Sequence, residues 1–188
     1  PSEPDPDIYA HKYVHCDILI AGAGPTGLMA ALNAGSSGAK VILCDQNARL
    51  GGMLLSRQST VAGKDCADWI ADTLATLRTM PNITILNRTT ATGYYDHNLL
   101  VLDERVADHK PAPENCEPRH RLWHVRAKEV VLATGSIERP LVFSENDLPG
   151  IMLSSAAQAY ANSYGALVGK SAVVFTNNSS AYRAASNL

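Results

Sequence analysis

Residues 17–27 read Asp-Ile-Leu-Ile-Ala-Gly-Ala-Gly-Pro-Thr-Gly, and their order of apolar residues and glycines indicates the fold of the chain. The apolar residues 18–20 have the length and composition of a short buried strand. A glycine-rich turn follows directly, and an alanine-rich apolar stretch at 28–32 then favours a helix. Residues 41–43 predict a second buried strand. The order strand, helix, strand predicts two parallel strands joined by a helical crossover.

The turn has the spacing G-x-G-x-x-G, which in this strand-to-helix context is typical of dinucleotide-binding loops. Gly22 allows a tight turn, Gly24 lets the backbone approach a pyrophosphate, and Gly27 lets the helix pack on the strand. Phosphate groups then meet the free N–H groups of the first helical turn, which begins at Pro25 and Thr26. The loop therefore predicts a site for the ADP half of FAD or NAD.

A carboxylate follows the second strand at Asp45, roughly twenty residues beyond the first glycine of the loop. In that position it accepts hydrogen bonds from the adenosine ribose and repels a 2′-phosphate. Arg49 is the one nearby cation that can offset this repulsion. We therefore expect a preference for the unphosphorylated ribose, with Asp45 and the adjacent Gln46 on the ribose side. NAD and FAD share this moiety, so the loop does not distinguish them.

Further along the chain, helical spacing at 66–80 predicts a second helix and residues 83–85 a third strand. The pattern is β over 89–102 and again over 121–132, with a proline-rich connection at 108–118. We predict an α/β fold of the Rossmann type, with a parallel sheet and an added antiparallel β segment.

After Gly150 the composition shifts to Ala and Ser. A helix is expected to run toward Gly165, followed by a buried strand at 172–175 and the start of another helix. A lone strand with one helix cannot bury its own apolar faces, so this part is expected to be an incomplete second α/β domain. The predicted organisation is an N-terminal extension at 1–16, an FAD/NAD(P)-binding domain at 17–150 and the truncated domain at 151–188.

Composition excludes several classes of protein. The 188 residues carry a net charge of −2, and their 16 Lys and Arg are scattered, so no nucleic-acid partner is expected. No apolar run approaches the ~18 residues that a membrane span needs. The four cysteines, at 16, 44, 66 and 116, form no C-x-x-C pair. Reduced thiols of this kind fit a cytoplasmic protein.

The sequence contains no convincing motif for a metal site or for a nucleophilic catalytic site. Cys116, His120 and His124 have C-x3-H-x3-H spacing, but a fourth ligand is missing and no metal is predicted. No set of Ser, His and Asp residues has the spacing of a known catalytic motif, and neither does any pair of carboxylates. No catalytic residue is therefore nominated.

Two small-residue turns extend the nucleotide-binding pattern. A Gly-Gly pair at 51–52 follows Asp45, and an Ala-Thr-Gly turn at 133–135 ends the late strand. Together they resemble the two-dinucleotide-binding-domain flavoproteins. The resemblance implies that three of these residues border the first nucleotide: Gly52, Thr134 and Gly135.

The last third of the chain sharpens the resemblance. Tyr-Tyr-Asp-His-Asn at 94–98, Gly-Ser-Ile-Glu-Arg-Pro-Leu-Val-Phe at 135–143 and Pro-Gly-Ile-Met-Leu at 149–153 resemble the alpha subunit of heterotetrameric sarcosine oxidase. The similarity extends from about residue 16 to residue 188. It is shared by subunits of opine oxidase and hydrogen cyanide synthase.

The resemblance implies a part of a hetero-oligomeric oxidoreductase complex with other subunits as partners. Such a complex oxidises the secondary amine sarcosine, and electrons pass from FAD on the beta subunit through FMN at the subunit interface to oxygen, while folate receives the one-carbon unit. It also implies that the present chain holds NAD as a tightly bound nucleotide that does not turn over. Two alternatives stay open: FAD at this loop in a related amino-acid or opine oxidase, and a non-catalytic nucleotide-binding structural module.

Overall fold

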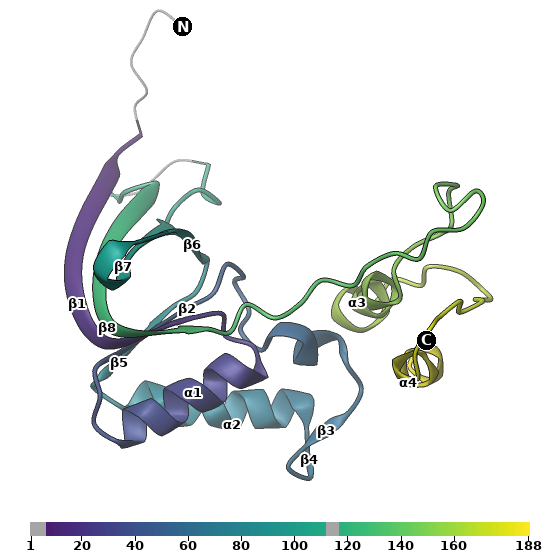
Figure 1. Ribbon diagram of the computed structural model, residues 1–188, viewed down its shortest axis with the longest axis horizontal. Coiled ribbons are helices and arrows are strands. Elements are labelled where there is room, and N and C mark those ends of the chain that lie inside the picture. The colour runs from purple at the N-terminus through teal and green to yellow at the C-terminus, as the bar shows by residue number, and fades with distance from the viewer. Residues whose placement is uncertain (1–6, 112–116) are drawn as a thin grey trace, which may run out of the picture. The chain divides into compact units, whose positions relative to one another are not determined.

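The computed structural model describes residues 7–111 and 117–188. The chain divides into two compact units, Pro1–Gly52 with Asp72–Thr134, and Met53–Ala71 with Gly135–Leu188. The first unit is built on a six-stranded sheet in the order β5-β2-β1-β8-β7-β6 (Figure 1). Its strands are β1 (Tyr9–Ala21), β2 (Val41–Cys44), β5 (Ile83–Leu86), β6 (Thr89–Tyr95), β7 (Leu99–Arg105) and β8 (His120–Leu132).

The sheet has a parallel and an antiparallel part. β1 pairs in parallel with β2 and with β8, and β2 pairs in parallel with β5. β6, β7 and β8 form an antiparallel meander, which we call the meander below. The predicted α/β fold with a parallel sheet and an added antiparallel segment is confirmed. The β pattern predicted over 89–102 is a hairpin, because the short 3-10 turn η2 (Asp96–Asn98) separates β6 from β7. The proline-rich connection joins β7 to β8, and residues 112–116 of it lie outside the described residues.

β1 is much longer than the strand predicted at 18–20. It pairs with β8 from Tyr9 opposite His120 to Ala21 opposite Leu132. Only one face of its first half contacts the core. The strand pattern is obscured because the outward face carries the aromatic Tyr13, whereas Lys12 lies on the inward face with Val14. Residues 9–16, expected to lie in the N-terminal extension, are therefore part of the central sheet.

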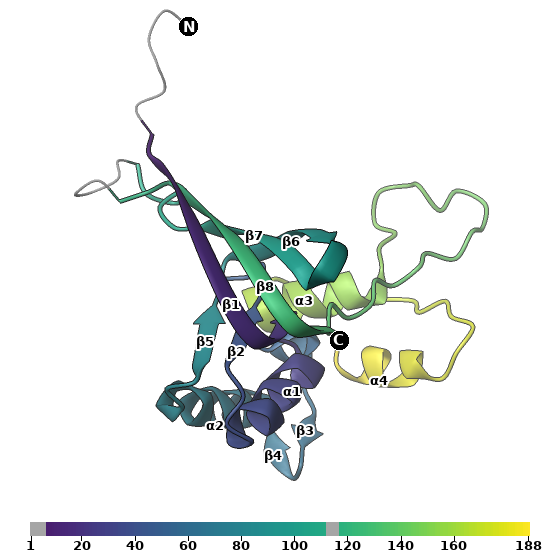
Figure 2. The same ribbon diagram turned by 60° about the vertical axis from the view of Figure 1, so that its left-hand side comes forward.

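Two helices accompany the parallel strands, α1 (Pro25–Ser36) and α2 (Cys66–Thr79). Figures 1 and 2 both show them next to each other, below β1 and β2. α1 contacts β1 and β2 and buries Leu28 and Ala31 completely. α2 buries Leu74 and Leu77. α1 therefore packs its apolar face against the parallel part of the sheet, as expected for the helical crossover between β1 and β2.

The second unit contains the 3-10 helix η1 (Gly52–Ser56) except for its first residue, the two-stranded hairpin of β3 (Thr60–Val61) and β4 (Lys64–Asp65), the beginning of α2, and the helices α3 (Ser154–Tyr164) and α4 (Ser180–Ser186). α3 is tied to the end of η1 through its last turns. Asn162 Nδ2 donates to Ser56 O at 2.9 Å, and Ser163 Oγ donates to Leu55 O at 3.2 Å. The helix predicted to end at Gly165 is confirmed by the left-handed C-cap at that glycine, with φ 65°.

The buried strand predicted at 172–175 is wrong. These residues have no regular structure, and Val173 and Phe175 are 98% and 66% exposed. A strand is held by hydrogen bonds to a neighbouring strand, and within residues 7–111 and 117–188 no strand lies beside this segment.

Candidate nucleotide-binding site

The first glycine of the loop is fixed by close backbone contacts. Gly22 has φ +102°, and its N–H donates to Cys44 O at 2.8 Å. A Cβ at this position would lie 2.3 Å from Ala133 O. The turn between β1 and α1 therefore has room only for glycine, because both the left-handed backbone and the nearby carbonyl exclude a side chain.

The third glycine lets α1 pack directly on this turn. A Cβ on Gly27 would lie 1.8 Å from Gly22 O, which is a backbone atom that cannot rotate away. Gly22 and Gly27 are thus both required by the packing of the loop itself.

Gly24 differs from its two neighbours in the motif. A Cβ built there meets nothing closer than Gly52 Cα at 3.9 Å, and its φ of −72° is accessible to any residue. Gly52, by contrast, has φ +55°, and its own Cβ would lie 2.8 Å from Gly24 Cα. Gly51 N donates to Ala23 O at 2.9 Å and holds the Gly-Gly turn against the loop. The protein leaves open space over Gly24.

The open space adjoins the N-terminus of α1. Gly24 is the N-cap, Pro25 occupies the first helical position, and among the described residues no side chain caps this end. The N–H groups of Thr26 and Gly27 have no partner inside the helix. They and the helix dipole make this end a favourable place for an anion.

Asp45 lies at the end of β2 and is buried. Its Oδ2 accepts a hydrogen bond from Ala23 N at 2.7 Å. Its Oδ1 accepts two, from Asn47 N at 2.8 Å and from Asn47 Nδ2 at 3.0 Å. A carboxylate has about four acceptor positions, so about one stays available for a ligand hydroxyl. Asp45 therefore also fixes the glycine loop, a role that its position in the sequence did not predict.

The remaining candidate residues are placed as follows. Gln46 is exposed, and its carbonyl accepts a hydrogen bond from Arg105. Thr134 is exposed and directly follows Ala133, whose N–H donates to Ala21 O at 2.8 Å. Gly135 has φ +75° and begins the second unit. The structure brings Gly22, Gly24, Gly27, Asp45 and Gly52 together at the loop, and the backbone of Thr134 lies beside them, because a Cβ on Gly22 would lie 3.1 Å from Thr134 N.

Among the described residues, the cysteines and histidines do not gather into a metal-binding cluster. Nowhere in the described part of the chain do three His, Cys, Asp or Glu side chains come close enough to hold a metal ion. Cys116 lies outside the described residues, and His120 Nδ1 contacts Asp103 Oδ1 at 2.9 Å. Burial raises the pKa of Cys16 to about 11 and that of Cys44 to about 12. Both thiols are therefore protonated and unreactive at neutral pH.

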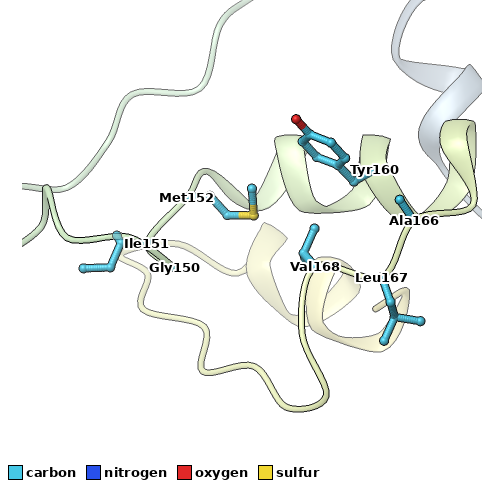
Figure 3. A pocket seen from close by; sticks show the side chains of 7 residues that line it. All are labelled: Gly150, Ile151, Met152, Tyr160, Ala166, Leu167 and Val168. Atoms are coloured by element: carbon cyan, nitrogen blue, oxygen red, sulfur yellow. The ribbon is translucent and has the colours of Figure 1, made fainter.

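A pocket in the second unit is lined by no cysteine, histidine or carboxylate. Figure 3 shows its lining, which is formed by backbone and apolar side chains around Met152, Tyr160 and Val168. The phenol of Tyr160 is the one ionisable group among the lining residues.

None of the described helices is long and apolar enough to cross a membrane.

Known proteins are similar to this chain over most of its length. Residues 17–132 match the family model of FAD dependent oxidoreductases. The chain is 49% identical to the alpha subunit of sarcosine oxidase from Rhizobium meliloti (strain 1021), over 99% of its own length and 19% of that relative. It is 32% identical to a subunit of opine oxidase from Agrobacterium tumefaciens (strain Ach5), covering 80% of this chain and 30% of the relative. Among solved structures, L-proline dehydrogenase from P. horikoshii matches with a TM-score of 0.68 and 26% identity, over 85% of this chain and 31% of that one.

Proposed function

Since the chain belongs to the family of FAD-dependent oxidoreductases, we propose that it is the dinucleotide-binding part of a protein like the alpha subunit of sarcosine oxidase. The observation that carries the proposal is the open space over Gly24 at an uncapped helix N-terminus, next to a buried carboxylate. Gly22 and Gly27 shape this space, and Gly52 closes it on the side of the Gly-Gly turn.

The residues of the loop bind the ADP half of the nucleotide. The pyrophosphate lies over Gly24, where the N–H groups of Thr26 and Gly27 and the positive end of the α1 dipole stabilise its charge. Pro25 fixes the backbone of the first turn without adding a competing donor. A bound dinucleotide would supply redox chemistry through its nicotinamide or flavin ring. The residues of this chain bind the dinucleotide, orient it and stabilise its charge.

Asp45 orients the adenosine ribose. Its remaining acceptor position takes a ribose hydroxyl, and its negative charge disfavours a 2′-phosphate in the same place. Gln46 lies beside Asp45 on the exposed side. We assign Thr134 and Gly135, at the end of β8, to the border of the same nucleotide.

The nucleotide that we propose is NAD, held tightly and without turnover, with FMN and FAD elsewhere in the complex. This proposal follows the similarity to sarcosine oxidase alpha subunits. FAD at the loop is the second candidate, and the family match favours it. Both contain ADP, so the residues described above serve either one.

The chain spans 19% of the length of the sarcosine oxidase relative. Oxidation of sarcosine or a related secondary amine, and assembly with other subunits, are therefore proposals for the whole protein. We place no catalytic residue in this chain. The domain organisation stays a proposal, with the boundary at 150/151 kept and the start of the first domain moved from residue 17 to residue 9, where β1 begins. We also propose a cytoplasmic location, on the basis of the free cysteines Cys16, Cys44 and Cys66.

The test is the identity of the nucleotide that copurifies with the protein. The protein is denatured, and the released compound is identified by chromatography and by its absorption spectrum. NAD without flavin bands supports the first candidate, and FAD supports the second. Absence of any adenine nucleotide, together with no binding of added ADP, would contradict the proposal. Anaerobic mixing with sarcosine then shows whether the nucleotide is reduced, which a purely structural module excludes.

A further inference from the structure

The segment that follows β2 is held by an unbroken series of hydrogen bonds. Four consecutive carbonyls, those of residues 45–48, each accept one bond from the β5–β6 turn or from the end of β7. The pairs are Asp45 O with Thr89 N at 2.8 Å, Gln46 O with Arg105 Nη2, Asn47 O with Arg88 N at 3.0 Å, and Ala48 O with Asn87 Nδ2 at 3.2 Å. One face of this segment is thus fixed by the protein, while Gln46 stays exposed.

Arg105 is the charged donor of this series. It is the last residue of β7, and its backbone is tied to the turn because its N–H donates to Arg88 O at 3.0 Å. Arg88 Nε donates in return to Arg105 O at 3.2 Å, and the Arg88 guanidinium pairs with Asp108. The backbone of Arg105 is therefore fixed on both sides by Arg88, and its guanidinium extends from there to the carbonyl of Gln46.

The bond to Gln46 has a consequence for Asp45. The carbonyl of Gln46 and the N–H of Asn47 belong to the same planar peptide group. Arg105 holds the oxygen of this group, and the hydrogen of the same group donates to Asp45 Oδ1 at 2.8 Å. The other oxygen of Asp45 accepts from Ala23 N at 2.7 Å. A continuous chain of hydrogen bonds thus leads from the meander to the glycine loop.

Such a chain is cooperative. A cation on the carbonyl oxygen polarises the peptide, which strengthens the bond that its N–H donates to the carboxylate. The arrangement is not optimised for stability alone, because Arg105 Nε is buried and has no hydrogen-bond partner within the described residues.

We propose that Arg105 is a positioning residue of the nucleotide site. Acting through the 46–47 peptide, it holds the carboxylate of Asp45 in the orientation that fixes the glycine loop and accepts the ribose hydroxyl. This inference rests on the nucleotide-binding function proposed above. It gives the meander a role in the site although the meander supplies no residue of the glycine motif.

The test is a double-mutant cycle on ADP binding, with the intact chain freed of its nucleotide. ADP is common to NAD and FAD, so the result does not depend on which one is native. Arg105→Met keeps the length of the side chain but removes its donors, and we expect ADP affinity to fall about tenfold, a loss of ~1.4 kcal/mol. Arg105→Lys keeps one donor and should stay within about threefold of the wild type. In an Asp45→Asn background, Arg105→Met should cost less than about twofold, because the group through which it acts has lost its charge.

Arg126→Met is the matched control. Arg126 also donates to main-chain carbonyls of the meander, Asp96 O at 3.1 Å and His97 O at 2.9 Å, but not to residues 45–48. Its substitution should leave ADP affinity unchanged, and melting temperatures of both variants show that binding is measured on folded protein.

The outcomes separate the two proposals. If the wild type binds no ADP, the proposed function fails and this inference fails with it. If the wild type binds ADP but Arg105→Met costs the same in both Asp45 backgrounds, or no more than Arg126→Met, the nucleotide site stands and the positioning role of Arg105 is wrong.

Discussion

Replacing Gly24 by alanine tests whether glycine is needed at this position for ligand binding or for the packing of the protein itself. A Cβ at Gly24 would find only Gly52 Cα, at the ordinary contact distance of 3.9 Å, and the backbone at φ −72° accepts alanine. Loss of unfolded-state freedom should even stabilise the chain by about 0.4–1 kcal/mol. The ligand, however, meets the new methyl group where the pyrophosphate approaches the backbone. Losing one charge-assisted hydrogen bond, worth about 1.5–3 kcal/mol, corresponds to a roughly ten- to hundredfold weaker affinity.

Gly27→Ala is the matched comparison, because it adds the same methyl group to the same motif. Its Cβ would lie 1.8 Å from Gly22 O, so α1 has to move and the free energy of unfolding should fall by about 1–3 kcal/mol or more. Urea unfolding of the nucleotide-free chain, followed by circular dichroism, gives the stability, and calorimetric titration with ADP gives the affinity. If Gly24→Ala binds ADP as tightly as the wild type, or destabilises the chain as much as Gly27→Ala does, Gly24 does not serve the ligand in the way proposed here.

Four further outcomes follow from the structure. Asp45→Asn should weaken ADP binding by about 1.5–3 kcal/mol and reduce discrimination against a 2′-phosphate, measured by competing NAD with NADP; equal binding of both by the wild type would contradict the role of Asp45. The Glu138 carboxyl loses solvent on burial, which raises its pKa, but hydrogen bonds from Ser155 and Ser154 at the start of α3 outweigh this and leave the pKa below its ordinary value. Its stabilising contribution is therefore present at neutral pH and is lost as the pH falls through the lowered pKa. Glu138→Gln should flatten the acid limb of a pH–stability curve, and an unchanged limb would count against a stabilising role of these hydrogen bonds. Cys44, with a pKa raised to about 12, should resist iodoacetamide at about pH 7.5 until urea is added, whereas rapid alkylation of the folded chain would show that the thiol is exposed. Leu77→Ala should cost about 2–5 kcal/mol in urea unfolding because this side chain is fully buried, and a loss under about 1 kcal/mol would argue against its place in the core.

The parallel core could be predicted from the sequence because its signals are local. The buried strands at 18–20 and 41–43 and the glycine turn between them are each recognisable within a few residues, and the structure pairs Ile18 with Val41 in parallel. The first half of β1 escapes prediction because its alternation is broken: Lys12 lies on the same face as Val14 and Cys16, and the exposed face carries Tyr9 and Tyr13. The strand expected at 172–175 has suitable residues, but a strand depends on a neighbour that local sequence does not supply.

At the site, residue types can be recognised in the sequence but hydrogen-bond partners cannot. The glycine spacing and Asp45 were recognisable as a nucleotide-binding pattern. The contacts of Asp45 with Ala23 and Asn47 were not, although an Asp followed two residues later by a backbone donor is the pattern of an Asx turn. Arg105 lies far from the loop in sequence, and only the folding of the meander onto the end of β2 brings it to Gln46.

The ladder between β1 and β8 sets an order of events during translation. Tyr9 faces His120, so roughly 110 residues must leave the ribosome before the first half of β1 meets its neighbour. β2 can pair with β1 much earlier, but only over residues 18–21. Until then the nascent chain carries an open strand edge at 9–16, with Tyr9 and Tyr13 exposed beside it even in the finished fold. This edge is the part of the chain that a chaperone has most reason to cover while synthesis continues.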